Sequence, residues 1–294
     1  MTGGRMHDDE VPTDVGLVRR LLAAQFPRWA DLPVEAVPSA GTSNAIYRLG
    51  EDLVVRLPRI GDAVEQVRFE YEWLPRLAPG LPVRVPQPVA LGAPGAGYPW
   101  PWAVNRWIDG VTTAEGDGDR AGFAAALGRF VAALRRVDAT GARPGYRSGP
   151  LRDWDPYLRQ WTAAARGLVD TDAVLAAWEQ ALAVPEWDGP PVWTHGDLLP
   201  GNVLVDGGRL GGVIDFGAAG VGDPACDALP AWVLLTAETR EVFRAAAGFD
   251  DATWARGRGW ALPFVSALTY YRDTNPAMAA LGRRAVEAVL ADLA

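Results

Sequence analysis

Apolar residues recur every three or four positions in several stretches of this chain. Phe123, Leu127, Phe130 and Leu134 show this spacing within one such stretch. The period places apolar side chains along one face of a helix. On the same grounds, helices are expected after Thr13, over residues 62–77, Ala121–Val137, Asp155–Arg166 and Thr171–Leu182, and through most of the chain after Pro224.

Short runs of β-branched and other apolar residues predict the strands. Two or three strands are expected within residues 37–58. Three further strands are expected in the second half of the chain, at Val192–Thr194, Val203–Val205 and residues 211–214, with a hairpin turn at Asp206–Gly208 between the last two.

Strands come first along the chain and helices dominate later, an order typical of an α+β protein. A Pro- and Gly-rich passage leads into a final N-terminal strand near residues 100–107. We therefore expect an N-terminal lobe over residues 1–104, with residues 1–12 frayed, and a C-terminal lobe over residues 105–294.

Polar residues of one chemistry stand between the later strands. The triplet His195-Gly196-Asp197 is followed by Asn202, and the strand ending at Ile214 runs into Asp215 of an Asp-Phe-Gly triplet. An Asp, a following Asn and a second Asp in this order are the polar parts of a phosphoryl-transfer site. One carboxylate receives a hydroxyl proton, while the Asn and the other carboxylate hold Mg²⁺ against nucleotide phosphates.

Each half of this pattern also occurs by chance, since an Asp-Gly pair is usually only a turn. The two halves together, each flanked by expected strands, favour a kinase. A hairpin between them would bring Asn202 and Asp215 alongside each other as oxygen ligands of one cation. Mg²⁺ usually takes one or two protein ligands and completes its shell with phosphate oxygens and water.

At these motifs the chain resembles the aminoglycoside phosphotransferase family, a branch of the protein-kinase-like fold. His195–Asn202 matches the HGDxxxxN loop of the family, Asp215–Gly217 its Asp-x-Gly element, and Gly222–Asp227 the continuation. The similarity extends from about Val37 to the C-terminus. The resemblance implies a two-lobed fold, with a small, mainly β N-lobe and a larger, mainly helical C-lobe.

The same resemblance implies roles for individual residues. Asp197 would be the catalytic base, and Asn202 and Asp215 the Mg²⁺ ligands. Asp227 would brace the catalytic loop, and the imidazole of His195 is expected to do the same through hydrogen bonds.

Members of the family anchor ATP with a Lys on the third strand of the small lobe, paired with a Glu from the next helix. Arg56 stands in the Lys position here, in a chain whose 28 basic residues are all Arg. Arg presents a planar fork to phosphate or carboxylate and is not geometrically equivalent to an ammonium group. The replacement of Lys by Arg is therefore expected to change the affinity for the nucleotide. Of Glu65, Glu70 and Glu72, the helical register favours Glu70 as the partner.

The loop covering the phosphates would be Pro38–Asn44, in which Ser43 and Asn44 lead into the next strand. It lacks the GxGxxG of protein kinases, but a small, hydroxyl-rich turn can present N–H and hydroxyl groups to phosphate. The alternative is an ordinary hairpin turn. The resemblance places the adenine against backbone groups near Val104 and Asn105.

Composition narrows the class of protein. With 294 residues, 49% of them hydrophobic, the chain can bury the core of one two-lobed unit. No apolar run is long enough to span a bilayer, the start lacks a signal-peptide core, and a lone Cys226 fits a reducing cytoplasm. Two His residues make a zinc site improbable. The net charge of −8 argues against nucleic acid as a partner. A monomer or homodimer is expected.

The leading hypothesis is an ATP- or GTP-dependent O-phosphotransferase acting on a hydroxyl of a small molecule, by resemblance an aminoglycoside or related antibiotic. A kinase of a metabolite such as an amino alcohol, homoserine or a sugar derivative is the alternative. An inactive nucleotide-binding sensor is the second, favoured only by Arg56. The acidic excess slightly favours a cationic acceptor.

No motif in the sequence marks the residues that contact the acceptor. Asp273, within Tyr-Tyr-Arg-Asp-Thr-Asn, is the favoured candidate because it joins polar and aromatic groups. One or two of the 13 Trp residues could wall the acceptor cleft, since aromatic faces suit sugars and cations. The other acidic candidates are Asp153, Asp155, Glu238, Asp250 and Asp251.

Overall fold

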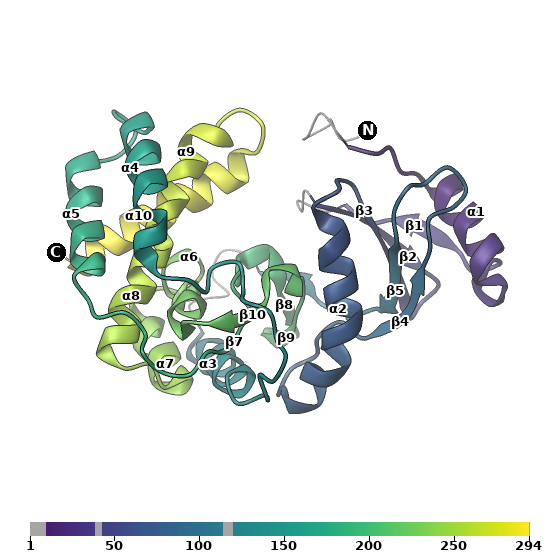
Figure 1. Ribbon diagram of the computed structural model, residues 1–294, viewed down its shortest axis with the longest axis horizontal. Coiled ribbons are helices and arrows are strands. Elements are labelled where there is room, and N and C mark those ends of the chain that lie inside the picture. Colours follow the sequence, from purple (N-terminus) through teal and green to yellow (C-terminus); the bar gives the residue numbers. More distant parts are fainter. Residues whose placement is uncertain (1–9, 39–42, 114–119, 294) are drawn as a thin grey trace. The chain divides into compact units, whose positions relative to one another are not determined.

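The computed structural model describes residues 10–38, 43–113 and 120–293 and divides into two compact units (Figure 1). Unit 1 holds the chain up to Gly110 together with Gly212–Gly217, and unit 2 holds Val111–Gly211 and Ala218–Ala294. Residues 1–12 were expected to be frayed, and most of them lie outside the described residues.

The division differs from the sequence prediction in two places. The predicted boundary at residue 104 falls inside strand β5 (Trp102–Arg106), which pairs with strands on both of its sides and therefore stays in unit 1. Gly212–Gly217 belongs with unit 1 because the N–H of Val213 donates to the carbonyl of Arg84 at 3.0 Å.

A five-stranded antiparallel sheet forms the centre of unit 1. Its order is β1-β2-β3-β5-β4, so β3 and β5 are interior strands. The register sets Arg56 of β3 between Ile46 of β2 and Ala103 of β5. The remaining strands are β1 (Val34–Ala36), β2 (Asn44–Leu49), β3 (Leu53–Pro58) and β4 (Pro88–Gly92).

Helices α1 (Val15–Gln25) and α2 (Ala63–Leu77) lie on the two faces of this sheet (Figure 1). Along β3, Val55 and Leu57 are fully buried in the core that includes α1. Successive side chains of a strand point to opposite faces. Arg56 therefore faces α2, where a charged side chain needs a charged partner. Short 3₁₀ turns η1 (Pro27–Trp29) and η2 (Ala78–Gly80) follow the two helices.

Unit 2 is mainly helical. Helix α3 packs closely on α7, because Gly128 has no side chain: a Cβ there would lie 2.6 Å from the carbonyl oxygen of Phe243. Predicted helix Thr171–Leu182 is observed with those bounds, whereas two others end two or three residues early. The helices are α3 (Ala121–Leu134), α4 (Asp155–Ala164), α5 (Thr171–Leu182), α6 (Pro230–Val233), α7 (Ala237–Ala247), α8 (Asp251–Ala261), α9 (Ala267–Tyr270) and α10 (Pro276–Leu293).

Two small sheets accompany these helices. One has the order β6-β8-β9, and the other pairs β7 with β10. Their strands are β6 (Val111–Thr112), β7 (Val192–Thr194), β8 (Val203–Asp206), β9 (Arg209–Val213) and β10 (Gly220–Gly222). The 3₁₀ segments are η4 (Leu151–Trp154), η5 (Pro200–Asn202), η6 (Phe216–Ala218), η7 (Pro224–Ala228) and η8 (Leu262–Ser266).

The expected α+β class is confirmed, with a mainly β unit 1 and a mainly helical unit 2. Within the described part of the chain, every helix is too short or too polar to cross a membrane.

Candidate active site

The loop between β7 and η5 is fixed by a buried carboxylate. Asp227, only 1% exposed, accepts a hydrogen bond from the backbone N–H of His195 through Oδ2 and from that of Gly196 through Oδ1, each at 2.8 Å. Burial raises the pKa of Asp227, while its interactions with His195 and with these two N–H groups lower it. Asp227 therefore occupies the bracing position that the sequence assigned to it.

Gly196 and His195 shape the turn that presents Asp197. Gly196 has φ +73°, and a Cβ there would lie 3.2 Å from the carbonyl oxygen of Ala218. Only glycine adopts this conformation without steric cost. His195 is fully buried, and its Nδ1 accepts the backbone N–H of Asp197 at 3.2 Å. The imidazole thus contacts the loop backbone, as expected from the sequence.

Both carboxylate oxygens of Asp197 have hydrogen-bond donors. Arg147 donates through Nη1 to Oδ1 at 2.7 Å, and Asn202 donates through Nδ2 to Oδ2 at 3.0 Å. The same Nη1 donates to the carbonyl of Gly196 at 2.6 Å. An ionised carboxylate offers about four acceptor positions, so a hydroxyl can still reach this group.

Asn202 closes the loop on itself. Its Nδ2 also donates to the backbone carbonyl of Asp197 at 2.8 Å, and its own N–H donates to Leu199 at 2.9 Å. The nitrogen end of the amide is thus directed at Asp197. The oxygen end is the atom suited to a hard cation. Thr113 secures the far end of the loop by donating through Oγ1 to the carbonyl of Pro200 at 2.8 Å.

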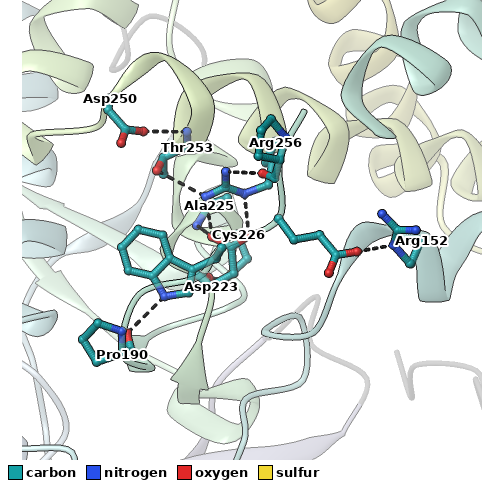
Figure 2. A network of polar contacts seen from close by, with 11 residues as sticks. Arg152, Pro190, Asp223, Ala225, Cys226, Asp250, Thr253 and Arg256 are labelled. Carbon is teal, nitrogen blue, oxygen red and sulfur yellow. Dashed lines mark hydrogen bonds and ion pairs between the residues drawn. The ribbon is translucent and has the colours of Figure 1, made fainter. Parts of the chain in front are cut away.

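A buried ion pair supports the segment that carries Asp227. Arg256 donates from Nε and Nη2 to the two oxygens of Asp223, at 2.7 and 3.1 Å, a two-pronged contact visible in Figure 2. Asp223 in turn caps η7 by accepting the N–H of Ala225 at 2.9 Å. Asp250 caps the helix that carries Arg256 by accepting the N–H of Thr253 at 2.7 Å (Figure 2). This chain of contacts fixes the start of η7 and with it Asp227.

Unit 1 contains the second polar cluster. Arg56 on β3 and Glu70 on α2 form a buried ion pair, so the structure brings together the two residues that the sequence paired. Nη2 of Arg56 also lies 3.3 Å from Oδ1 of Asp215. Burial alone would lower the pKa of Arg56, but the two carboxylates outweigh it and raise that pKa. Arg56 is therefore held as a cation. Burial raises the pKa of Glu70, against the lowering effect of Arg56.

Asp215 has an unusual backbone conformation. Its φ is +64°, and among the described residues only Ala96 shares a positive φ without being glycine. Asp tolerates this left-handed region better than most residues, and such strain is concentrated at functional sites. The turn ends β9 and leaves the Asp215 side chain 40% exposed.

Only some of the residues predicted to contact the nucleotide phosphates lie in the described part of the chain. Asn44 begins β2, and its Oδ1 is buried without a hydrogen-bond partner among the described residues. The carbonyl of Ser43 accepts the N–H of Arg59 at 2.8 Å. Residues 39–42 of the expected phosphate loop lie outside the described residues.

Val104 and Asn105, the residues expected near the adenine, lie inside the sheet of unit 1. Both lie within β5, whose backbone pairs with β3 on one side and β4 on the other. Backbone groups in an interior strand are used by the sheet. The adenine contact expected near these two positions stays a prediction.

Two residues near Asp197 were missed from the sequence. Arg147 precedes η4 and has no motif that marks it. Tyr271 is close enough for the charge of Asp197 to act on it: burial raises the pKa of Tyr271, and the neighbouring Tyr270 and Asp197 raise it further. The favoured acceptor contact, Asp273, is exposed in the turn before α10, and Tyr271 is the residue of this segment that the structure associates with Asp197.

The donor groups suit magnesium better than a softer metal. Asn202 and Asp215 provide an amide oxygen and a carboxylate, and Mg²⁺ needs only one or two such protein ligands. In the described residues, no three His, Cys, Asp or Glu side chains gather in a way that could hold a metal on their own. The two residues belong to different units, so their joint use of one cation stays a prediction.

Comparisons with known proteins agree with this chemistry. The profile of the phosphotransferase enzyme family matches residues 35–260. An aminoglycoside 3′-phosphotransferase of Streptomyces fradiae is 34% identical over 177 residues, which cover 53% of this chain and 59% of that protein. The match thus spans less than two thirds of the curated relative.

Solved structures show the same fold. The GDP complex of an aminoglycoside 2′-phosphotransferase-IIIa has a TM-score of 0.75 at 21% identity, covering 96% of this chain and 100% of the other. A macrolide 2′-phosphotransferase of Brachybacterium faecium has a TM-score of 0.62 at 26% identity, covering 95% and 98%. These likenesses establish the protein-kinase-like fold.

The buried pair in unit 1 yields a stability prediction. Glu70→Ala leaves Arg56 buried with only the more distant Asp215, so the free energy of unfolding should fall by about 3 kcal/mol. Urea denaturation followed by circular dichroism measures the change. The control is Glu72→Ala on the same helix, whose exposed pair with Arg76 should contribute less than about 0.5 kcal/mol. Equal losses in the two variants would contradict the prediction.

Proposed function

The chain belongs to the phosphotransferase enzyme family, and we propose that it transfers the γ-phosphate of ATP or GTP to a hydroxyl of a small molecule in a Mg²⁺-dependent reaction. The observation that supports this best is the carboxylate of Asp197, presented by a braced loop and oriented through both of its oxygens by Arg147 and Asn202.

In this proposal Asp197 is the general base. The acceptor oxygen forms a bond to the γ-phosphorus while the bond from that phosphorus to the β,γ-bridging oxygen breaks. The acceptor's proton passes to the Asp197 carboxylate, and the nucleoside diphosphate leaves with the bridging oxygen. Little covalent chemistry is required of the protein, so orientation and charge supply most of the rate.

Arg56 and Asp215 would serve the nucleotide. Mg²⁺, when bound, neutralises the charge of the phosphates, and Asn202 and Asp215 are the residues that would hold it. Arg56 keeps both the expected strand position and the expected Glu70 partner, so the substitution of Lys by Arg preserves the buried pair. The preserved pair supports an active enzyme over the inactive-sensor alternative, which only the replacement of Lys by Arg56 had favoured. Relatives of this fold have been solved with GDP, ADP and ATP, which leaves both ATP and GTP as candidate donors.

The proposal for the acceptor comes from proteins that are similar to this chain. The Streptomyces fradiae relative is an aminoglycoside phosphotransferase, and solved relatives carry kanamycin, gentamicin or streptomycin. We therefore take an aminoglycoside or related antibiotic as the first candidate, ahead of a small metabolite. A cytoplasmic location fits the nucleotide donor and the single, buried Cys226.

The direct test is a phosphorylation screen with Mg²⁺ and either ATP or GTP against aminoglycosides, macrolides and small amino alcohols. We expect transfer to at least one acceptor, and Asp197→Asn should lower kcat at least 100-fold because it removes the base but keeps the shape. Nucleotide binding, followed by calorimetry, should persist in this variant.

The matched control is Asp188→Asn, which changes an exposed carboxylate of the same unit and should leave kcat unchanged. Transfer by Asp197→Asn at the native rate would show that another group receives the proton. Nucleotide binding without transfer to any acceptor would restore the sensor alternative.

Arg147 should act through Asp197 and not through the nucleotide. Its guanidinium lies over the rings of Tyr146 and Phe264, with centroids 5.3 and 5.5 Å away, and these contacts favour one orientation. Arg147→Ala frees one oxygen of Asp197, so kcat should fall about 30-fold while KM for the nucleotide changes little, because misorientation of a base affects the chemical step.

Guanidinium ion in solution should restore part of the activity of Arg147→Ala, and Arg147→Lys should lie between the two. Arg152→Ala is the control, since it breaks an exposed ion pair with Glu186 on the neighbouring segment. A loss confined to nucleotide KM, with kcat intact, would rule out the positioning role.

A further inference from the structure

A small pocket in unit 2 is lined by segments that lie far apart in the sequence. Its volume is about 160 Å³. An apolar cavity of about 150 Å³ in another protein holds a benzene ring, so this pocket has room for a single ring. The residues to which we assign catalysis and nucleotide binding are absent from the described part of its lining. We call it the α5 pocket, and its lining comes from residues 148–152, from residues between 181 and 191, and from Gly222, Asp223 and Arg256.

The walls of the α5 pocket are mainly apolar. Leu151 and Leu182 contribute aliphatic side chains, and Trp187 contributes a half-buried indole ring. The ring is fixed, because its Nε1 donates to the carbonyl of Pro190 at 3.0 Å (Figure 2). It also lies against Gly189, where a Cβ would be only 2.4 Å from Cζ2 of the indole. A fixed ring face binds a flat apolar molecule with a small loss of conformational entropy.

The charges of the pocket cancel in pairs. In the described part of the chain, four charged side chains line it: Arg152 pairs with Glu186, and Arg256 pairs with Asp223. The first pair is largely exposed, whereas both side chains of the second pair are more than nine-tenths buried. An ionic ligand would therefore lose hydration in the pocket without gaining an unpaired counter-charge.

Arg256 retains one donor for a ligand. A guanidinium has five N–H groups. Those of Arg256 donate from Nε and Nη2 to Asp223, from Nη2 to Oγ1 of Thr253 at 3.4 Å, and from Nη1 to the carbonyl of Pro185 at 2.9 Å. Within the described residues, the second N–H of Nη1 has no acceptor. A buried donor without a partner is costly, so an oxygen atom of a ligand that reaches it is favoured.

The α5 pocket adjoins two segments that lead to the catalytic loop. Asp223 caps η7, which carries Asp227. Residues 185–191 run directly into β7, which ends one residue before His195. A ligand in the pocket contacts both segments, although Asp197 itself does not line the pocket.

We propose that the α5 pocket is a second binding site, for an uncharged aromatic molecule of one ring that carries a hydroxyl or carbonyl oxygen. The ring stacks on Trp187, and the oxygen accepts from Nη1 of Arg256. Phenol is the smallest molecule with these features. Binding connects residues 185–191 to Asp223 and so restrains the chain on both sides of the catalytic loop. The site is distinct from the proposed phosphotransfer and does not depend on it.

The first test compares three probes that differ in charge. Binding of 4-fluorophenol, 4-fluorobenzoate and 4-fluorobenzylammonium to the full-length protein is followed by fluorine NMR. We expect a dissociation constant on the order of 1 mM for the phenol, as is typical of so small a ligand. The anion and the cation should each bind at least tenfold more weakly, because each brings an unpaired charge into a neutral lining.

Substitutions then locate the bound phenol. Val184→Trp should abolish binding, because the larger side chain fills the pocket that Val184 lines. Val111→Trp is the matched control: it makes the same change at an exposed position of unit 2 outside the pocket, and binding should be native. Trp187→Ala adds no volume and should weaken binding about fivefold, whereas Trp187→Phe keeps a ring face and should stay within about twofold of native. Circular dichroism checks the fold of each variant.

Hydrogen exchange measures the restraint on the chain. Saturation with 4-fluorophenol should slow exchange at least threefold in peptides that cover residues 184–197 and leave peptides of unit 1 unchanged, because ligand contacts suppress local opening. The affinity for the phenol should be the same in the presence of saturating ADP or kanamycin, which are proposed to bind elsewhere.

Several results would overturn the inference: no binding of 4-fluorophenol at about 10 mM, equal binding of the three probes, native affinity in a folded Val184→Trp and in Trp187→Ala, slowed exchange only outside residues 184–197, or displacement by ADP or kanamycin. The proposed phosphotransfer fails in a different way, through the absence of Asp197-dependent transfer to any acceptor, and that result leaves binding in the α5 pocket unaffected.

Discussion

The contact on which the rest of the site depends is the buried carboxylate of Asp227. Its two oxygens hold consecutive backbone N–H groups, at His195 and Gly196, and a backbone clamped at two successive amides has little freedom to move. The left-handed turn at Gly196 comes directly before Asp197. Burying a charge is costly unless it is fully hydrogen-bonded. Here that cost is offset by donors that fix the loop, and the ion pair of Asp223 with Arg256 holds the segment that carries Asp227.

Unit 1 contains a buried cation, Arg56, inside a small β sheet. The alternation of β3 buries Val55 and Leu57 on one face and obliges Arg56 to occupy the other. Glu70 balances the charge, and Asp215, in a left-handed conformation, approaches the same guanidinium. The planar fork of Arg can meet two carboxylates at once. This geometry lets a chain without lysine hold a buried cation between two carboxylates.

Local sequence patterns predicted many of the helices and strands. The periodicity predicted α2, α3 and α5 closely, and the helical register selected Glu70, because both depend on residues near each other in sequence. The boundary expected at residue 104 differs from the division after Gly110 because strand pairing across the sheet, which keeps β5 in unit 1, leaves no local mark in the sequence. Arg147 and Tyr271 were missed for the same reason: each approaches Asp197 through tertiary packing, and neither lies in a motif.

The most direct measurement is the turnover of Asp227→Asn, since this one carboxylate holds the loop that positions the proposed base. An Asn offers one acceptor and turns an N–H₂ toward a backbone N–H, so the loop should shift while Asp197 itself is unchanged. With fold retention checked by circular dichroism and Asp188→Asn as the reference, kcat should fall about 100-fold and the KM for the nucleotide should stay unchanged. A well-folded variant with native kcat would show that Asp227 does not set the position of Asp197.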